Sequence, residues 1–254
     1  MELFSLEGKN AVVVGASRGI GKSLALTLAR AGANIIPVSR SPEKIKQTAL
    51  EAEAFGVKAQ AIPADVTIKE EVEKLKEEAL SALGKVDILV NCQGINIKKW
   101  ALELSPEEWK QVIDINLNSV FMTCKAFGSS MVEQRYGKII NIASMTSYVG
   151  IHRSSAYSAS KGGIVQLSQV LAMEWAPYNI NVNCIAPGFF RTEITRPVFS
   201  DKEAYNRIIA RTPMKRVGEV EDLSGTLLYL ASSASDYVTG ITIPVDGGFL
   251  AYGI

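Results

Sequence analysis

Tyr157 and Lys161 lie four positions apart in the stretch AYSASKGG, which spans residues 156–163. Residues four apart share one face of a helix, so the phenol and the ammonium would be neighbours. A positive charge beside a phenol favours its ionised form and lowers its pKa. The pair therefore has the chemistry of a general acid or base. The simpler explanation is an incidental pair on a surface helix, and the rest of the chain has to decide between the two.

A glycine-rich stretch near the N-terminus, VVVGASRGIGKSLALTLARAG, is the second feature that carries chemistry. Its glycines are Gly15, Gly19 and Gly21, preceded by a Val-rich run and followed by an amphipathic pattern. Glycine lets the chain turn tightly and lets a pyrophosphate approach the main-chain N–H groups at the start of a helix. In this strand–turn–helix context the spacing predicts dinucleotide binding at the carboxyl ends of parallel strands.

The residues after the next apolar run decide which dinucleotide is expected. A carboxylate there selects NAD through the adenosine ribose hydroxyls, whereas basic groups accommodate the 2′-phosphate of NADP. The run NIIPVSR has no acid and ends in Ser39 and Arg40, and Arg18 lies inside the glycine-rich turn. Guanidinium groups bind phosphate well. NADP (NADPH) is therefore the expected cofactor, with NAD as the alternative and solvated loop arginines as the simpler explanation.

Seven short apolar runs alternate with longer amphipathic stretches and must position these groups. The runs are residues 10–16, 33–39, 58–64, 86–91, 138–144, 180–187 and 241–248. Most are continuously apolar, which is typical of strands covered on both faces. Helices are expected at residues 20–31, 41–55, 69–83, 105–131, 156–176 and 220–230. The alternation predicts one α/β domain over residues 1–254, a doubly wound parallel sheet of about seven strands with helices on both faces.

One helix start is marked clearly. The stretch SPEEW offers Ser105 as N-cap, Pro106 at the first position and Glu108 to complete a capping box. The stretch SPEK at Ser41 is a weaker signal of the same kind.

Composition excludes several classes of function. The chain has 254 residues, 47% of them hydrophobic, and a formal net charge of +1, so neither nucleic acid nor a membrane surface is an expected partner. The first residues do not resemble a signal peptide, and no apolar run approaches the roughly 20 residues that span a bilayer. Three scattered cysteines are typical of a reducing, cytoplasmic location. His152 is the single histidine, so a multi-histidine metal site is excluded and no metal is expected.

Further motifs occur, with the glycine-rich turn, in an order that resembles the short-chain dehydrogenase/reductase family. They are NCQG at residues 91–94, IINIAS ending at Ser144, YSASK at residues 157–161 and IAPGFFRT at residues 185–192. The resemblance covers essentially the whole chain. It implies a Rossmann-type fold and an NAD(P)-dependent oxidoreductase that transfers a hydride between NADP(H) and a secondary alcohol or ketone.

The resemblance also implies roles for individual residues. Tyr157 would be the general acid in reduction and the base in oxidation, its pKa lowered by Lys161 and the oxidised nicotinamide. Ser144 would hydrogen-bond the substrate oxygen, and Asn116 would hold a water that relays protons to Lys161. The implied catalytic residues are Asn116, Ser144, Tyr157 and Lys161, and the substrate residues are Ser144, Arg153 and Tyr157. The glycine motif and the resemblance together imply cofactor binding by Gly15, Ser17, Arg18, Gly19, Ile20, Gly21, Ser39, Arg40, Asp65, Val66, Asn91, Gly94, Tyr157, Lys161, Pro187, Gly188 and Thr192.

Two positions depart from the family's usual pattern. Val14 stands where a threonine is usual, and Asn-Cys-Gln-Gly replaces Asn-Asn-Ala-Gly at residues 91–94. Because the first Asn and the final Gly are kept, we expect altered local hydrogen bonding with binding preserved.

Sugar-acid and polyol dehydrogenases are the members that the chain resembles most. Their likeness implies a small carbonyl or alcohol substrate under a mobile lid near residues 190–215, where Arg191 or Arg196 would meet a carboxylate, and a homotetramer. The alternatives are a 3-oxoacyl-acyl-carrier-protein reductase, a general carbonyl reductase and a non-catalytic NADP-binding regulator. In the carrier-dependent reductases two arginines dock the acidic carrier; here Arg135 matches one, and Tyr178 takes the other's place.

Overall fold

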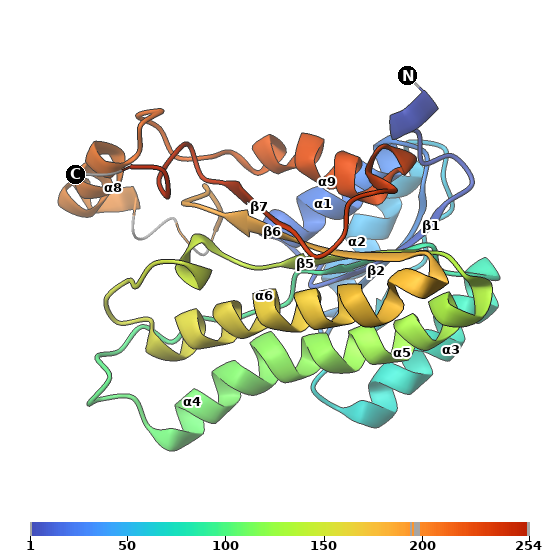
Figure 1. Ribbon diagram of the computed structural model, residues 1–254, viewed down its shortest axis with the longest axis horizontal. Helices are drawn as coiled ribbons and strands as arrows, with labels where there is room; N and C mark the ends of the chain where they lie inside the picture. The colour runs from blue at the N-terminus through green and yellow to red at the C-terminus, as the bar shows by residue number, and fades with distance from the viewer. Residues whose placement is uncertain (1, 194, 196–198, 253–254) are drawn as a thin grey trace.

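The computed structural model describes residues 2–193, 195 and 199–252 and shows one α/β domain built on a parallel sheet (Figure 1). Over these residues the sheet has seven strands in the order β3-β2-β1-β4-β5-β6-β7. The strands are β1 (Asn10–Val14), β2 (Asn34–Ser39), β3 (Ile62–Pro63), β4 (Ile88–Asn91), β5 (Gly137–Ile142), β6 (Ile180–Pro187) and β7 (Thr242–Val245). The strand order reverses between β1 and β4, which is where ligands bind in open sheets of this kind.

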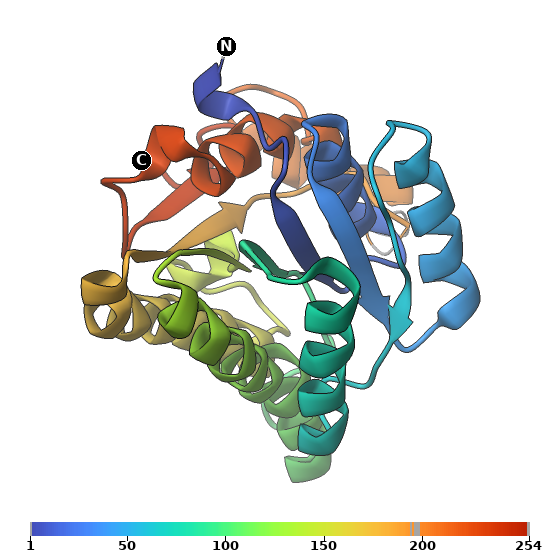
Figure 2. The same cartoon turned by 90° about the vertical axis from the view of Figure 1, so that its right-hand side faces the viewer.

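Helices cover both faces of the sheet, as the continuously apolar runs predicted. The long helices are α1 (Gly19–Arg30), α2 (Pro42–Glu53), α3 (Lys69–Leu83), α4 (Pro106–Ile113), α5 (Ser119–Gln134), α6 (Ser155–Trp175), α8 (Lys202–Arg211) and α9 (Ser224–Ala231). In Figure 2 the green and yellow helices α5 and α6 lie below the sheet, whereas the red α9 lies above it. The side chains of successive β1 residues lie on opposite faces of the sheet. Val12 packs on the face covered by α5 and α6, and Val13 packs on the face covered by α1 and α9. A strand buried on both faces has to be apolar throughout.

Helix α4 continues through a π turn, η2 (Asp114–Asn118), into α5. A single uninterrupted α-helix over residues 105–131 was expected, so this element differs from the prediction. A π turn widens the helix locally and re-aims one side chain. That side chain is Asn116, which is fully buried.

Helices α5 and α6 pack closely because small residues face large ones. A Cβ added to Gly128 would lie 2.5 Å from the Trp175 ring, and one added to Gly163 would lie 2.8 Å from Leu117. The glycines therefore bring α6, with Tyr157 and Lys161 near its start, close against the α4–α5 helix.

The capping box of α4 is confirmed. Ser105 Oγ accepts a hydrogen bond from the Glu108 N–H at 3.2 Å, and the Ser105 N–H donates to the Glu108 carboxylate at 3.0 Å. The start of α2 differs from the weaker prediction, since the Ser41 side chain makes no capping bond.

Two sequence expectations fall partly on residues that are not described. The proposed lid near residues 190–215 includes residues 194 and 196–198, and Arg196 itself lies outside the described residues. None of the helices in the described part of the chain has the length and apolar character needed to cross a bilayer.

Candidate active site

The residues expected to bind a cofactor gather at one edge of the sheet. All strand pairs of the described sheet are parallel, so the carboxyl ends of the strands meet there. The expected residues lie at or just beyond the ends of β1 (Gly15, Ser17, Arg18, Gly19, Ile20, Gly21), β2 (Ser39, Arg40), β3 (Asp65, Val66), β4 (Asn91, Gly94) and β6 (Pro187, Gly188, Thr192). Tyr157 and Lys161 reach the same edge from the first turns of α6.

Ser144, Tyr157 and Lys161 form a compact group. The Ser144 and Tyr157 hydroxyls are hydrogen-bond partners, and Lys161 Nζ lies 5.7 Å from the centre of the Tyr157 ring. Ser144 also caps the short helix that follows β5, because its Oγ accepts from the Thr146 N–H at 3.1 Å. The serine thus serves both as a local cap and as the tyrosine's partner.

Lys161 is held by the sheet itself. Its Nζ donates to the Ile142 carbonyl at 2.6 Å, and the residue is only 4% exposed. Burial lowers the pKa of Lys161 to about 8, because removing an ammonium from water disfavours its charged form. Helix spacing predicted that Lys161 lies close to Tyr157, and the structure confirms this proximity.

The protein alone does not make Tyr157 acidic. Burial raises the pKa of Tyr157, the hydrogen bond with Ser144 opposes that rise, and the neighbouring Cys92 adds to it. The expected lowering by Lys161 is not among these effects. A shift below the ordinary value thus needs a further positive charge beside the phenol, which is what an oxidised nicotinamide carries.

Asn116 places its amide against the loop that follows β4. Its Oδ1 accepts from the Ile95 N–H at 2.8 Å, while its Nδ2 donates to the Ile95 carbonyl at 2.9 Å and to Ser160 Oγ at 3.0 Å. A Cβ on Gly94 would lie 3.4 Å from Asn116 Oδ1 and 3.7 Å from Lys161 Nζ, so the three residues meet at this point.

The glycine-rich turn has the shape that a phosphate group requires. Gly15 has φ +83°, and a Cβ on Gly21 would lie 2.2 Å from the Gly15 carbonyl oxygen. Both positions therefore demand glycine. Helix α1 starts at Gly19 without a side-chain cap from Arg18. Its first N–H groups face the sheet edge, and together with the helix dipole they fit the pyrophosphate of a dinucleotide.

The side of the site expected to take adenosine carries two arginines, each beside a carboxylate. Arg40 Nη1 lies 3.7 Å from Asp65 Oδ2, and Arg18 Nη1 lies 3.9 Å from Glu193 Oε2. Burial acts to raise the pKa of Asp65, but hydrogen bonds from Thr67 and the charge of Arg40 outweigh it and hold that pKa below its ordinary value. Asp65 is therefore an anion in the folded protein at neutral pH.

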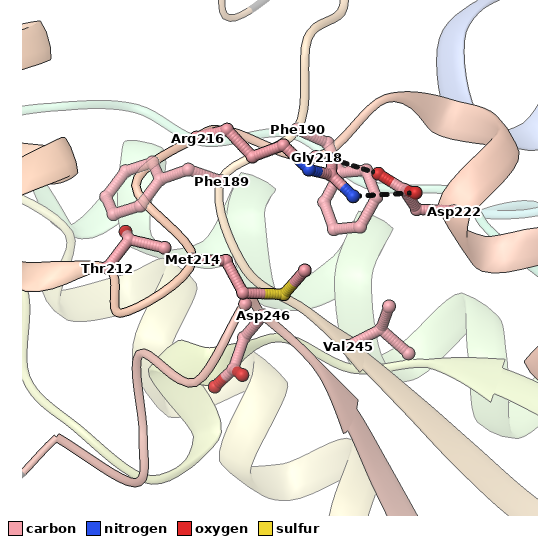
Figure 3. Close-up of a pocket in the computed structure, with 10 residues that line it drawn as sticks. Phe189, Phe190, Thr212, Met214, Arg216, Gly218, Asp222, Val245 and Asp246 are labelled. Carbon is pink, nitrogen blue, oxygen red and sulfur yellow. Dashed lines mark hydrogen bonds and ion pairs between the residues drawn. The ribbon is translucent and has the colours of Figure 1, made fainter.

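A pocket of about 220 Å³ opens just beyond the ends of β6 and β7 (Figure 3). Figure 3 shows Phe189, Met214 and Val245 lining it, with Arg216 and Asp222 joined by two bonds at its rim. The main chain at Gly188 lies close to Asp246, which lines this pocket. A Cβ added to Gly188 would lie 2.8 Å from Asp246.

The side of the site proposed for substrate joins two loops. Arg153 donates from Nη2 to the Lys98 carbonyl at 3.2 Å, and Asn96 donates to Ser154 Oγ at 3.3 Å. Arg153 adopts φ +64°, a conformation that non-glycine residues rarely take. The rings of His152 and Trp100 are tilted by 53°, with their centres 5.8 Å apart. Arg153 thus joins the loop before α6 to the loop that follows β4.

Comparison with known proteins identifies the fold and its family. Residues 15–250 match the family model described as enoyl-(acyl carrier protein) reductase, adh_short_C2. The chain is 42% identical over 254 residues to 2-dehydro-3-deoxy-D-gluconate 5-dehydrogenase of Escherichia coli (strain K12), covering 99% of both proteins. It is 39% identical over 249 residues to 5-keto-D-gluconate 5-reductase of the same strain, covering 98% of both. The structure of a gluconate 5-dehydrogenase from Burkholderia cenocepacia J2315 in complex with NADP and tartrate superposes with a TM-score of 0.95, at 36% identity and 98% coverage of both chains.

The chain belongs to the short-chain dehydrogenase/reductase family. The resemblance drawn from the sequence motifs is thereby confirmed, and the protein is an oxidoreductase of that family.

Within this short-chain dehydrogenase/reductase the Asn-Cys-Gln-Gly stretch makes its side-chain contacts with α5 and β5. Gln93 Nε2 donates to Ser119 Oγ at 3.1 Å, and Gln93 Oε1 is buried with no hydrogen-bond partner among the described residues. Asn91 turns its side chain into the protein, where it bonds Asn141 at 2.8 Å and accepts from Thr123 at 2.8 Å. Any contact of Asn91 with a cofactor would therefore use its main chain.

Several residues at the site had no signal in the sequence. Ser160, Ile95 and Glu193 reach it only through long-range contacts, which a local pattern does not report. Among the described residues no cluster of three His, Cys, Asp or Glu side chains is placed to hold a metal ion.

Proposed function

We propose that this chain is an NADP(H)-dependent dehydrogenase that interconverts a ketone and a secondary alcohol on a sugar acid, in the manner of a gluconate 5-dehydrogenase. The observation that carries the proposal is the Ser144–Tyr157–Lys161 group, assembled on the same sheet edge as the glycine-rich turn. The names of the relatives and the NADP in the B. cenocepacia structure support the substrate class and the cofactor.

The cofactor would be held along the sheet edge. The α1 N-terminus and the glycine-rich turn take the pyrophosphate, while Arg18, Ser39 and Arg40 take the 2′-phosphate. Asp65 and Val66 lie where the adenine would rest, and Pro187, Gly188 and Thr192 where the nicotinamide would. When bound, NADPH supplies the hydride that is added to the carbonyl carbon.

Tyr157 handles the proton. In reduction its hydroxyl donates a proton to the carbonyl oxygen, and in oxidation the tyrosinate accepts the proton of the alcohol. Ser144 donates a hydrogen bond to the same oxygen and stabilises its developing charge. Lys161 contributes positive charge near the phenol, and Asn116 holds the loop at Gly94 and Ile95 that borders Lys161.

The substrate carboxylate would lie toward Arg153. Arg153 lies four residues before Tyr157 in the chain, and its exposed guanidinium donates to the Lys98 carbonyl at 3.2 Å. Its remaining N–H groups would be available to bind a carboxylate. Arg191 is less suited, because its guanidinium is paired with Glu219 at 3.0 Å.

The acyl-carrier alternative is disfavoured at the second docking position, where Tyr178 stands in place of an arginine. The exposed Arg135 guanidinium donates to the Pro177 carbonyl at 2.9 Å and lies 5.8 Å from the Tyr178 ring centre. A general carbonyl reductase needs no group that binds a substrate carboxylate, and a non-catalytic regulator needs no Tyr157–Lys161 pair.

The remaining expectations concern assembly and location. We propose a homotetramer, supported by exposed apolar side chains on α4–α6, among them Trp109, Phe121, Val170 and Met173. Gel filtration would give a monomer mass if this is wrong.

A cytoplasmic location is supported by the three free cysteines. The whole chain acts as one cofactor-binding domain, with the described part of residues 190–215 covering the substrate.

An NADPH-oxidation screen tests the proposal. The candidate substrates are 5-keto sugar acids, ketoses without a carboxylate, diketones and acetoacetyl thioesters. We expect kcat/KM to be highest for the keto sugar acids. An Arg153→Gln variant should lose that preference by raising KM for the acids alone. A best substrate among the thioesters would overturn the proposal in favour of a carrier-dependent reductase.

A further inference from the structure

Both arginines proposed for the 2′-phosphate already face a carboxylate of this chain. The Arg40–Asp65 pair is formed beside the adenine position, between the ends of β2 and β3. The Arg18–Glu193 pair is different, because it joins the glycine-rich turn after β1 to the segment after β6. A carboxylate and a phosphate monoester compete for the same guanidinium donors.

Glu193 owes its position to a turn closed by two threonines. The Thr192 N–H donates to Thr195 Oγ1 at 2.9 Å, and the Thr195 N–H donates to Thr192 Oγ1 at 3.2 Å. Thr195 Oγ1 in turn donates to the Phe190 carbonyl at 2.6 Å. These bonds join Thr192 to Thr195, and Thr195 to Phe190, around the position of Glu193.

The base of this turn is fixed to the body of the protein. Phe190 is 4% exposed, and its ring lies so close to Gly218 that a Cβ there would be 2.6 Å away (Figure 3). The Gly218 N–H donates to the Phe189 carbonyl at 2.8 Å, and the Arg191 N–H donates to the Gly218 carbonyl at 2.8 Å. The Thr192 side chain meets Gly19, where an added Cβ would lie 3.7 Å from it. The turn therefore approaches the glycine-rich turn beside two adjacent residues, Arg18 and Gly19.

We propose that Glu193 is a specificity-determining residue whose carboxylate competes with the 2′-phosphate of NADP for Arg18. This inference rests on the proposed function, because it requires NADP to bind at Arg18. NADP must displace or share the Glu193 contact, whereas NAD carries a hydroxyl at that position and leaves the pair intact. The carboxylate thus weakens NADP binding relative to NAD. It also links the bound phosphate to the segment that follows β6.

The expected effect of Glu193 on the binding constant for NADP is small but measurable. The pair is solvent-exposed, and exposed ion pairs correspond to at most about a fivefold change in a binding constant. Salt screens such pairs, so the effect should shrink as ionic strength rises.

The test is isothermal titration of NADP+ and NAD+ into the wild type and Glu193→Gln at low ionic strength. We expect the variant to bind NADP+ about two- to fivefold more tightly, with NAD+ affinity unchanged. Glu219→Gln is the matched control, because it breaks the neighbouring Arg191–Glu219 pair without touching Arg18. It should leave both affinities unchanged. In an Arg18→Gln background the Glu193→Gln change should no longer tighten NADP+ binding.

Each contrary result has a distinct meaning. Unchanged NADP+ affinity in Glu193→Gln, or equal tightening of both cofactors, overturns the competition. Weaker binding of both cofactors also overturns it, since Glu193 would then serve to hold the turn. A wild type that binds no NADP+ overturns the proposed function together with this inference.

Discussion

Asn116 bonds both main-chain polar groups of Ile95, accepting from its N–H at 2.8 Å and donating to its carbonyl at 2.9 Å. The Asn116 amide thus supplies the pair of hydrogen bonds that a neighbouring strand would otherwise give to the main chain of Ile95. The π turn makes this reach possible, because it directs a fully buried amide toward the carboxyl end of β4.

Replacing Asn116 by Ala should remove three hydrogen bonds at once. Because Ile95 would be left without these partners, we expect the free energy of unfolding to fall by about 1–3 kcal/mol. Chemical denaturation measures it. Asn118→Ala is the matched control, since Asn118 lies in the same π turn but is itself exposed and, among the described residues, donates its amide to Asp114 at 2.8 Å. Equal losses in the two variants would contradict the role assigned to Asn116.

Replacing Tyr157 by Phe should abolish proton transfer while keeping the ring. We expect kcat to fall by about 10²- to 10⁴-fold, and NADPH affinity to stay within about twofold of the wild type, because the phosphate contacts are untouched. Steady-state kinetics and fluorescence titration measure the two quantities. Tyr148→Phe, at an exposed tyrosine beyond Ser144, should retain full activity. A fully active Tyr157→Phe enzyme would remove the basis of the proposed mechanism.

Lys161 should give the protein a characteristic pH dependence of stability. Burial lowers its folded-state pKa from 10.5 to about 8. Below pH 8 both the folded and unfolded states carry the proton, so this group adds no slope. Between about pH 8 and 10.5 only the unfolded state keeps it, so the free energy of unfolding rises with pH, by up to about 3 kcal/mol in all.

Denaturation of the wild type and Lys161→Met across pH 7–10.5 isolates this contribution. The wild type should gain stability relative to the variant as the pH rises, whatever the offset between them at pH 7. A difference that stays flat over this range would show that the ammonium is not held in a desolvated place. Lys138→Met is a contrast, because Lys138 is buried with Asp236 and Asn181 as partners at 2.8 Å each. Its removal should lower stability at pH 7.

Replacing Arg40 by Glu should turn cofactor preference from NADP toward NAD. A carboxylate at this position would repel the 2′-phosphate and accept hydrogen bonds from the ribose hydroxyls. We expect the ratio of kcat/KM values for NADP and NAD to fall by at least about tenfold, which corresponds to about 1.4 kcal/mol. An unchanged ratio would mean that the phosphate is held by Arg18 alone or elsewhere.

The fold was predictable where local pattern and tertiary packing agree. Helix α3 occupies residues 69–83 as expected, because its apolar stripe faces the core without interruption. The α4 capping box was predictable because all its partners lie within four residues. Adjacency of Tyr157 and Lys161 followed from helix spacing alone.

The differences arise where distant residues decide the local structure. The π turn forms where Asn116 bonds Ile95, and nothing within residues 105–131 reports that contact. Ser41 precedes a Pro-Glu pair, as Ser105 does, yet the Ser41 N–H bonds Ser39 Oγ and its own side chain does not cap. The raised pKa of Tyr157 depends on burial, which residue spacing does not reveal.

The order of strands along the chain divides the site into two separately encoded parts. The groups proposed for adenosine come from residues 10–66, and the groups proposed for proton transfer come from residues 116–161. A chimera that exchanges the first segment with that of a homologue should transplant coenzyme choice without disturbing the reaction. Glu193 limits that independence, because it reaches back from the second half to the first.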